Sequence, residues 1–200
     1  RGMSADVTYA SYLDLGRILE AQHPASDAHD ELLFIIVHQA SELWLKLCLH
    51  ELTAARECIE GDRLRPAFKM LARVARAQAQ LIQSWDVLST MTPHDYSAIR
   101  PYLGASSGFQ SAQYRMMEFL MGGRNPKMVT MHEATPEVAA ELRAELARPS
   151  LYDEAVRLLA RRGFAIDAAA LERDPAAPYA PNPSVEAAWA SIYRDPQPHW

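Results

Sequence analysis

The stretch from Asp30 to Glu60 constrains the fold more than any other feature of this sequence, because it contains neither proline nor glycine. It ends at Gly61-Asp62, a strong stop signal for a helix. Its first half, LLFIIV, is apolar on every face, which predicts burial on all sides. Its second half is amphipathic, with these residues expected to face inward: Trp44, Leu45, Cys48, Leu49 and Leu52. We therefore predict one long helix here.

Helical patterns dominate the remainder, and no alternating run of Val, Ile or Thr is bounded by turn residues as a strand would be. The further predicted helices are Thr8–Glu20, Pro66–Ser89, a segment from Thr92 broken near Pro101, one that ends at Met121, Pro136–Ala147, Ser150–Arg162 and Ser184–Tyr193. The fold class is therefore all-α, a long-helix bundle with a smaller helical insert. We assign the core bundle to residues 1–123, the peripheral insert to 124–183, and the return to the core to 184–200.

Composition excludes several classes of protein. The net charge of −5, with no basic stripe, argues against a nucleic-acid partner. Cys48 and Cys58 match no metal or redox spacing, which favours a reduced, cytoplasmic protein. No signal peptide is apparent, and no unbroken apolar run reaches the length of about 18 residues that a membrane span needs. We interpret Arg1-Gly2 before Met3 as residues left from an expression vector.

His38 is the first candidate for chemistry. It lies one helical turn from Phe34 and one turn from Glu42, so one helix face would present an aromatic ring, an imidazole and a carboxylate. Burial would keep the imidazole neutral, and a neutral imidazole accepts a hydrogen bond from a weak N–H donor. The alternative is a structural role, in which His38 binds a backbone carbonyl in the core.

Tyr96 and Arg100 are the second candidates, four residues apart in a segment that begins with the capping pattern Thr92-Pro93-His94-Asp95. Pro101 bends the chain directly after Arg100. An arginine at a bend beside a tyrosine is typical of a carboxylate clamp, because a guanidinium binds a carboxylate through two parallel hydrogen bonds. The alternative is an ordinary surface arginine.

The other motifs in the sequence say less about function. The segment Gly104–Gly108 either lets the backbone approach a ligand or only connects two helices, and it is no phosphate loop because it lacks the lysine. The remaining histidines form no metal-binding pair, and no GxSxG motif is present. We interpret the carboxylate pairs Asp30-Glu31 and Glu57-Glu60 as solvated helix faces.

Two long motifs resemble those of the haem-dependent tryptophan 2,3-dioxygenase family. The first is the run from His29 to Lys46, HDELLFIIVHQASELWLK. The second is MTPHDYSAIRPYLGASSGFQSAQYRMMEFLMG, from Met91 to Gly122, in which SSGFQSAQYR is especially specific. The opening Tyr9-Ala10-Ser11-Tyr12-Leu13 also fits. The resemblance covers roughly the first 120 residues well, and two long motifs in order make chance a poor explanation.

The resemblance implies a role for each matching residue. His38 would be catalytic and would hydrogen-bond the indole nitrogen of L-tryptophan, while Arg100 and Tyr96 would hold its carboxylate. The remaining substrate contacts would come from Phe34, Ile35, Ile36, Val37, Leu103 and Ser107. Trp85 and Ser107 would lie close to haem b, and Tyr9, Tyr12 and Leu13 would reach into a neighbouring subunit's pocket of a homotetramer.

The implied reaction inserts both atoms of O₂ across the indole C2–C3 bond to give N-formylkynurenine, with ferrous haem as the site of oxygen chemistry. The family's axial histidine lies in a later helix, and no histidine of this sequence matches it, so we expect that ligand beyond Trp200. Two alternatives stay open: a haem-free module that binds tryptophan or another indole, and a purely structural helical oligomer in which His38 belongs to the core.

Overall fold

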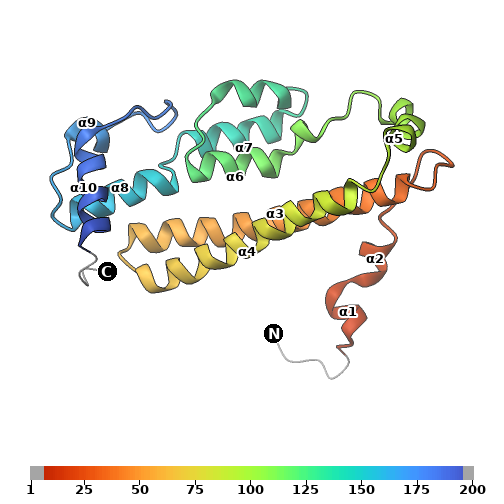
Figure 1. Cartoon of the computed structure of the whole chain (residues 1–200), viewed down its shortest axis with the longest axis horizontal. Coiled ribbons are helices and arrows are strands. Elements are labelled where there is room, and N and C mark those ends of the chain that lie inside the picture. The colour runs from red at the N-terminus through yellow and green to blue at the C-terminus, as the bar shows by residue number, and fades with distance from the viewer. Residues whose placement is uncertain (1–6, 196–200) are drawn as a thin grey trace. The chain divides into compact units, whose positions relative to one another are not determined.

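The computed structural model describes residues 7–195, and within them every regular element is helical and no strand occurs, which confirms the predicted all-α class (Figure 1). Arg1-Gly2, interpreted above from the sequence, lies outside the described residues. The described residues form two compact units: the first holds residues 7–41 together with Gln83–Ser106, and the second holds Glu42–Ile82 together with residues 107–195. The division at residues 123 and 183 expected from the sequence stays a prediction.

The first unit contains α1 (Tyr9–Leu13), α2 (Leu15–Leu19), the beginning of α3 (Glu31–Glu60), the end of α4 (Leu64–Leu88), α5 (Pro93–Ile99) and the 3₁₀ turn η1 (Arg100–Leu103). The single helix predicted from Thr8 to Glu20 is wrong, because Asp14 adopts a left-handed conformation with φ 53° and separates α1 from α2. Aspartate tolerates this region better than most residues. The break that Pro101 predicts is confirmed, since α5 gives way to η1 at Arg100.

The apolar run at the start of α3 is less buried than its sequence predicts. Leu32 and Ile36 remain 45% and 47% exposed, and the other members of LLFIIV are half-buried. By length and composition α3 also suffices to cross a membrane, with a mean hydropathy of 1.5 over an 18-residue window, although the core helix of a soluble protein has the same properties. The prediction of burial on all sides fails because a helix in this unit has too few neighbours to cover every face. Exposed apolar surface of this kind is typical of a face that meets another protein surface.

The second unit contains the remainder of α3 and α4, followed by these elements: η2 (Gly108–Gln110), α6 (Ala112–Met121), η3 (Pro126–His132), α7 (Pro136–Leu146), α8 (Leu151–Arg161), α9 (Ala168–Leu171) and α10 (Pro183–Arg194). Its main core joins α3, α4 and α6 through Leu45, Cys48, Leu52, Val74, Ala77, Met117 and Leu120. Trp44 was predicted to face inward, but its side chain is 37% exposed because it lies beside the buried stripe of α3 rather than on it. A second cluster packs α7 and η3 on α6 around Phe119 and Leu142.

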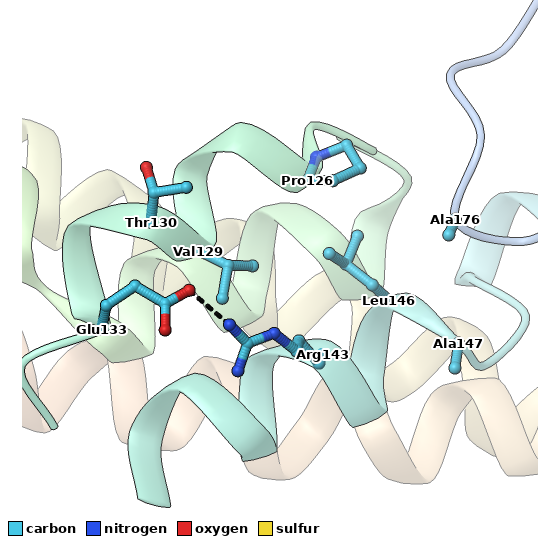
Figure 2. Close-up of a pocket in the computed structure, with 8 residues that line it drawn as sticks. All are labelled: Pro126, Val129, Thr130, Glu133, Arg143, Leu146, Ala147 and Ala176. Carbon is cyan, nitrogen blue, oxygen red and sulfur yellow. Dashed lines mark hydrogen bonds and ion pairs between the residues drawn. The ribbon is translucent and has the colours of Figure 1, made fainter. Parts of the chain in front are cut away.

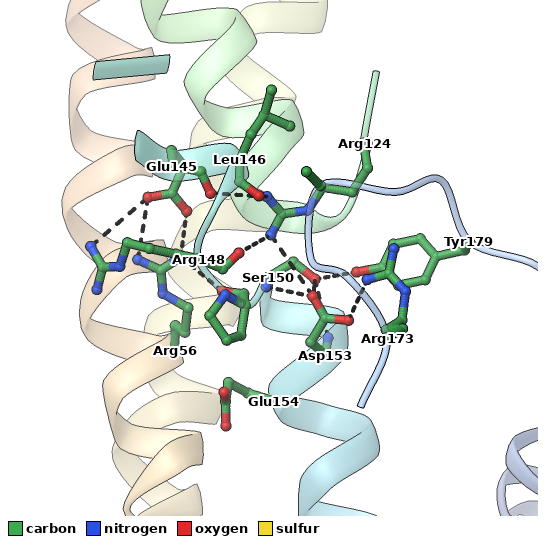
Figure 3. A network of polar contacts seen from close by, with 12 residues as sticks. Arg56, Arg124, Glu145, Leu146, Arg148, Ser150, Asp153, Glu154, Arg173 and Tyr179 are labelled. Carbon is green, nitrogen blue, oxygen red and sulfur yellow. Dashed lines mark hydrogen bonds and ion pairs between the residues drawn. The ribbon is translucent and has the colours of Figure 1, made fainter. Parts of the chain in front are cut away.

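A buried polar network secures the end of α7 in the second unit (Figure 3). The Arg124 guanidinium donates to the carbonyls of Glu145, Leu146 and Arg148 at 2.9, 3.3 and 2.7 Å. The first two carbonyls belong to the last turn of α7, where backbone acceptors lack helical partners, and the third lies two residues after the helix. Arg56 pairs with the Glu145 carboxylate and also donates to the Pro149 carbonyl at 3.1 Å. Two buried guanidinium groups therefore supply hydrogen-bond donors to backbone carbonyls at and just after the end of α7.

Asp153 forms the other half of this network. Its carboxylate accepts hydrogen bonds from the Ser150 backbone N–H at 2.7 Å and hydroxyl at 2.8 Å, and from Arg173 at 2.8 Å. Burial by itself would raise the pKa of Asp153, but the hydrogen bonds from Ser150 and the Arg173 charge outweigh it and lower the pKa. The Arg173 guanidinium in turn lies 4.0 Å from the centroid of the Tyr179 ring.

We predict that Asp153→Asn destabilises the protein by about 3 to 5 kcal/mol at neutral pH, because it leaves the Arg173 charge without its partner. The lowered pKa means that the ionised carboxylate stabilises the fold above the unfolded-state pKa of about 3.9, and that this contribution is lost as the pH falls through the lower, folded-state pKa. Urea unfolding between pH 7 and pH 3 should therefore show the difference between wild type and variant shrinking with acid. The exposed Asp86→Asn is the control, and a difference that does not change with pH would contradict the assignment.

Candidate functional site

Three aromatic rings of the first unit lie together on α3 and α5. The Phe34 and His38 rings, one turn apart on α3, have centroids 4.2 Å apart and an interplanar angle of 37°. The Tyr96 ring of α5 has its centroid 6.3 Å from that of Phe34. The separation of four residues predicts that Phe34 and His38 share a face, whereas the approach of Tyr96 is a tertiary contact that spacing does not reveal. These rings are called the three-ring cluster below.

The cap of α5 positions Tyr96. The Thr92 side chain accepts from the Asp95 backbone N–H, and the Asp95 carboxylate accepts from the Thr92 backbone N–H at 2.9 Å, so the predicted capping box is present. The hydrogen bonds from the Thr92 hydroxyl and N–H lower the pKa of Asp95. At the other end of α5, Ile99 is fully buried. Tyr96 therefore extends from a short helix that is fixed at both ends.

The His38 ring is oriented by the backbone of its own helix. Its Nδ1 lies 2.7 Å from the Phe34 carbonyl oxygen. Because a carbonyl only accepts, this partner assigns the hydrogen to Nδ1, and in the neutral ring Nε2 is then an acceptor. His38 is half-buried rather than fully buried as the sequence predicts. The hydrogen bond to a backbone carbonyl that a structural role for His38 predicts is thus present. It uses only one of the two ring nitrogens.

Arg100 opens η1 and is exposed. Its Nη1 donates to the Gly104 carbonyl at 2.8 Å. Gly104 has φ 57° and ψ −129°, a conformation that residues with a side chain rarely adopt. The turn at Gly104 thus aims a carbonyl back at the guanidinium and orients it, which leaves further N–H donors of Arg100 for a ligand.

The remaining predicted site residues are more scattered. Ile35, Val37 and Leu103 are half-buried, whereas Ile36 and Trp85 are exposed. Ser107 belongs to the second unit, where its hydroxyl caps η2 by accepting from the Phe109 N–H at 3.3 Å. On α1, the exposed fractions of Tyr9, Tyr12 and Leu13 are 78%, 78% and 37%. Among all these residues, the structure shows ring contacts only for the three-ring cluster, within residues 7–195.

Glu31 contradicts the interpretation of Asp30-Glu31 as a solvated pair. Its side chain is buried and accepts hydrogen bonds from the backbone N–H groups of Ala25 and Ser26. Two acidic residues at the start of a helix are usually solvated, and this is why the sequence favoured that interpretation. The partners of Glu31 lie in a loop, and the sequence does not give the path of that loop. The one signal in the sequence is Ser26, a hydrogen-bond donor five residues before Glu31.

Two pockets lie in the second unit, and their lining decides whether they suit a prosthetic group. The first, of about 420 Å³ in the second unit, lies between η3 and α7, with the Arg143–Glu133 ion pair at its edge (Figure 2). The second, of about 540 Å³, lies at the beginning of α4 and is lined by Arg63, Arg65 and Arg162 among others. Neither is lined by a histidine. The described residues also contain no group of three or more His, Cys, Asp or Glu side chains that could hold a metal ion.

Comparison with known proteins gives a consistent match. The tryptophan 2,3-dioxygenase family profile matches residues 1–149. A tryptophan 2,3-dioxygenase of Erythrobacter litoralis is 75% identical over 198 residues, which is 99% of this chain and 75% of that protein. Proteins of the same name from Paraburkholderia phytofirmans and Cupriavidus necator are each 58% identical over 98% of this chain, covering 64% and 66% of their own length. The chain thus spans about two thirds to three quarters of the length of these relatives.

We predict that Gly104→Ala lowers the free energy of unfolding by about 1 to 3 kcal/mol through backbone strain. A Cβ at Gly104 would meet no atom within 4 Å, so steric overlap is not the cause. Gly108→Ala is the matched control, because its Cβ would also meet nothing and its φ is not in the left-handed region. Equal losses of stability for both variants in urea unfolding would contradict the assigned turn.

Proposed function

The chain belongs to the tryptophan 2,3-dioxygenase family, and we propose that the three-ring cluster and Arg100 recognise L-tryptophan in an oxidoreductase that converts it to N-formylkynurenine. Both atoms of O₂ are inserted across the indole C2–C3 bond. This is the first step of tryptophan catabolism by the kynurenine route. The other partner is therefore O₂, and no nucleic acid or membrane takes part.

The assigned tautomer of His38 carries the proposal. An indole N–H only donates, so it needs an acceptor, and Nε2 is the acceptor that the bond from Nδ1 to the Phe34 carbonyl leaves. The Phe34 ring lies against the same imidazole and offers an apolar face to the indole. Ile35, Ile36, Val37 and Leu103 are proposed as further contacts of the indole; Ile35, Val37 and Leu103 are half-buried and Ile36 is exposed. His38 thus orients the indole for attack at C2–C3.

Arg100 and Tyr96 account for the amino-acid end of the substrate. The Gly104 carbonyl holds one guanidinium nitrogen of Arg100, and the remaining N–H groups suit a carboxylate. The Tyr96 hydroxyl adds one donor from the adjacent turn of the chain. Together with His38, this pairing would suit a substrate that carries both an indole and a carboxylate.

Family membership implies haem b with ferrous iron, which would supply the activation of O₂. Neither of the two pockets described above fits an iron site, because neither is lined by a histidine, and the buried Nε2 of His132 is enclosed by protein. We propose that the histidine that would hold the iron lies in the part of the relatives that residues 1–200 do not span. Trp85 and Ser107 are proposed to face the haem.

A cytoplasmic homotetramer is the proposed assembly. The 78% exposure of both Tyr9 and Tyr12 supports a role in a neighbouring subunit's pocket, together with Leu13, since large aromatic side chains gain most from burial at an interface. The exposed Leu32 and Ile36 on α3 offer further apolar surface for association.

We predict that His38→Asn in the haem-loaded, full-length enzyme weakens binding of L-tryptophan about 3- to 10-fold, the value of one hydrogen bond. The asparagine amide keeps a donor for the Phe34 carbonyl but removes the acceptor at Nε2. Binding of β-(3-benzothienyl)alanine, which has sulfur in place of the indole N–H, should stay unchanged. Competition against turnover measures both affinities.

The exposed His50→Ala on α3 is the control and should alter neither affinity. Equal weakening of both ligands by His38→Asn would show that His38 supports the pocket without contacting the indole N–H. Such a result would favour the structural role for this histidine.

A further inference from the structure

The described part of the chain before α3 is attached to α3 by side chains rather than by a core. Residues 7–30, called the N-terminal arm here, contain no buried residue. Helices α1 and α2 have five residues each, too short to be stable by themselves. The position of the arm therefore depends on specific polar contacts within the first unit.

The first attachment is Glu31, the first residue of α3. Its carboxylate accepts from the Ala25 N–H at 2.8 Å, from the Ser26 N–H at 2.7 Å and from the Ser26 hydroxyl. The Glu31 side chain is buried, so these three donors replace water around the charge. The same hydrogen bonds, the Ser26 hydroxyl foremost and then the Ala25 N–H, lower the pKa of Glu31. Only an ionised carboxylate accepts from all three donors.

The second attachment is Gln39, eight residues and about 12 Å further along α3. Its Nε2 donates to the Ala21 carbonyl at 2.9 Å, and its Oε1 accepts from Gln22 Nε2 at 2.6 Å. Gln22 Nε2 also donates to the Ile18 carbonyl at 2.9 Å, near the end of α2. Because the Ala21 carbonyl only accepts, the orientation of the Gln39 amide is fixed.

We propose that Glu31 and Gln39 are positioning residues, which hold the N-terminal arm along the turns of α3 that carry Phe34 and His38 and thereby set the affinity for substrate. Phe34 and His38 lie between the two attachments in sequence. The arm carries Tyr9 and Tyr12, so its placement decides where these side chains are presented. The effect on affinity rests on the proposed function, whereas the attachment itself does not.

Hydrogen–deuterium exchange and steady-state kinetics on the haem-loaded, full-length enzyme test this inference. Glu31→Gln replaces one carboxylate oxygen by an amide NH₂ group, which cannot accept from the backbone N–H groups of Ala25 and Ser26. We therefore expect faster hydrogen–deuterium exchange in peptides covering residues 21–28 and unchanged exchange around Cys48–Leu52. The KM for L-tryptophan should rise about 3- to 10-fold, with kcat within about 2-fold. Gln39→Ala should act in the same direction. The exposed Glu141→Gln on α7 is the matched control and should change neither readout.

Three outcomes would overturn the proposal. Faster exchange throughout the protein, including Cys48–Leu52, would assign Glu31 a merely structural role. Faster exchange in the arm with an unchanged KM would remove the link to substrate, and unchanged exchange would remove the attachment. If Glu31→Gln fails to fold, Ser26→Ala removes one of the three hydrogen bonds and should give a smaller change in the same direction. A wild-type enzyme that does not turn over tryptophan would refute the proposed function, and exchange at residues 25–26 would still decide the attachment.

Discussion

The repeat of the helical backbone in α3 is the constraint on which the candidate site depends. It places His38 one turn after Phe34. The Phe34 backbone carbonyl can therefore accept a hydrogen bond from Nδ1 of His38 and hold the imidazole in place. The orientation of the His38 imidazole is thus set by main-chain geometry. The Phe34 ring, 4.2 Å from the imidazole, adds a packing constraint in the same direction.

The two units use polar groups in different ways. In the second unit, Arg56, Arg124 and Asp153 are buried beside apolar clusters: the two arginines bind groups at the end of α7, and Asp153 caps the start of α8. In the first unit there is little core, and Glu31 and Gln39 hold a segment that has no buried residue. A region held by a few directional bonds opens at lower free energy than a packed one, which suits a segment whose exposed tyrosines are offered to a partner.

Local signals in the sequence predicted what depends on neighbouring residues. The stop at Gly61, the capping box of Thr92 and Asp95, and the break before Pro101 all follow from residues close in sequence. The shared face of Phe34 and His38 also follows from helical spacing.

Features that depend on another segment were missed, such as the approach of Tyr96 and the burial of Glu31. The break at Asp14 was missed because aspartate is compatible with both a helix and a left-handed turn. The identity of the family came from two long motifs, not from any single residue of the site.

A crystal structure of the haem-loaded, full-length enzyme with L-tryptophan bound would show whether His38 contacts the indole. We expect the indole nitrogen to lie about 2.7 to 3.2 Å from Nε2 of His38, while Nδ1 keeps its bond to the Phe34 carbonyl and the substrate carboxylate lies against Arg100. An indole nitrogen that faces away from His38, or a ring turned so that Nε2 meets the Phe34 carbonyl, would contradict it.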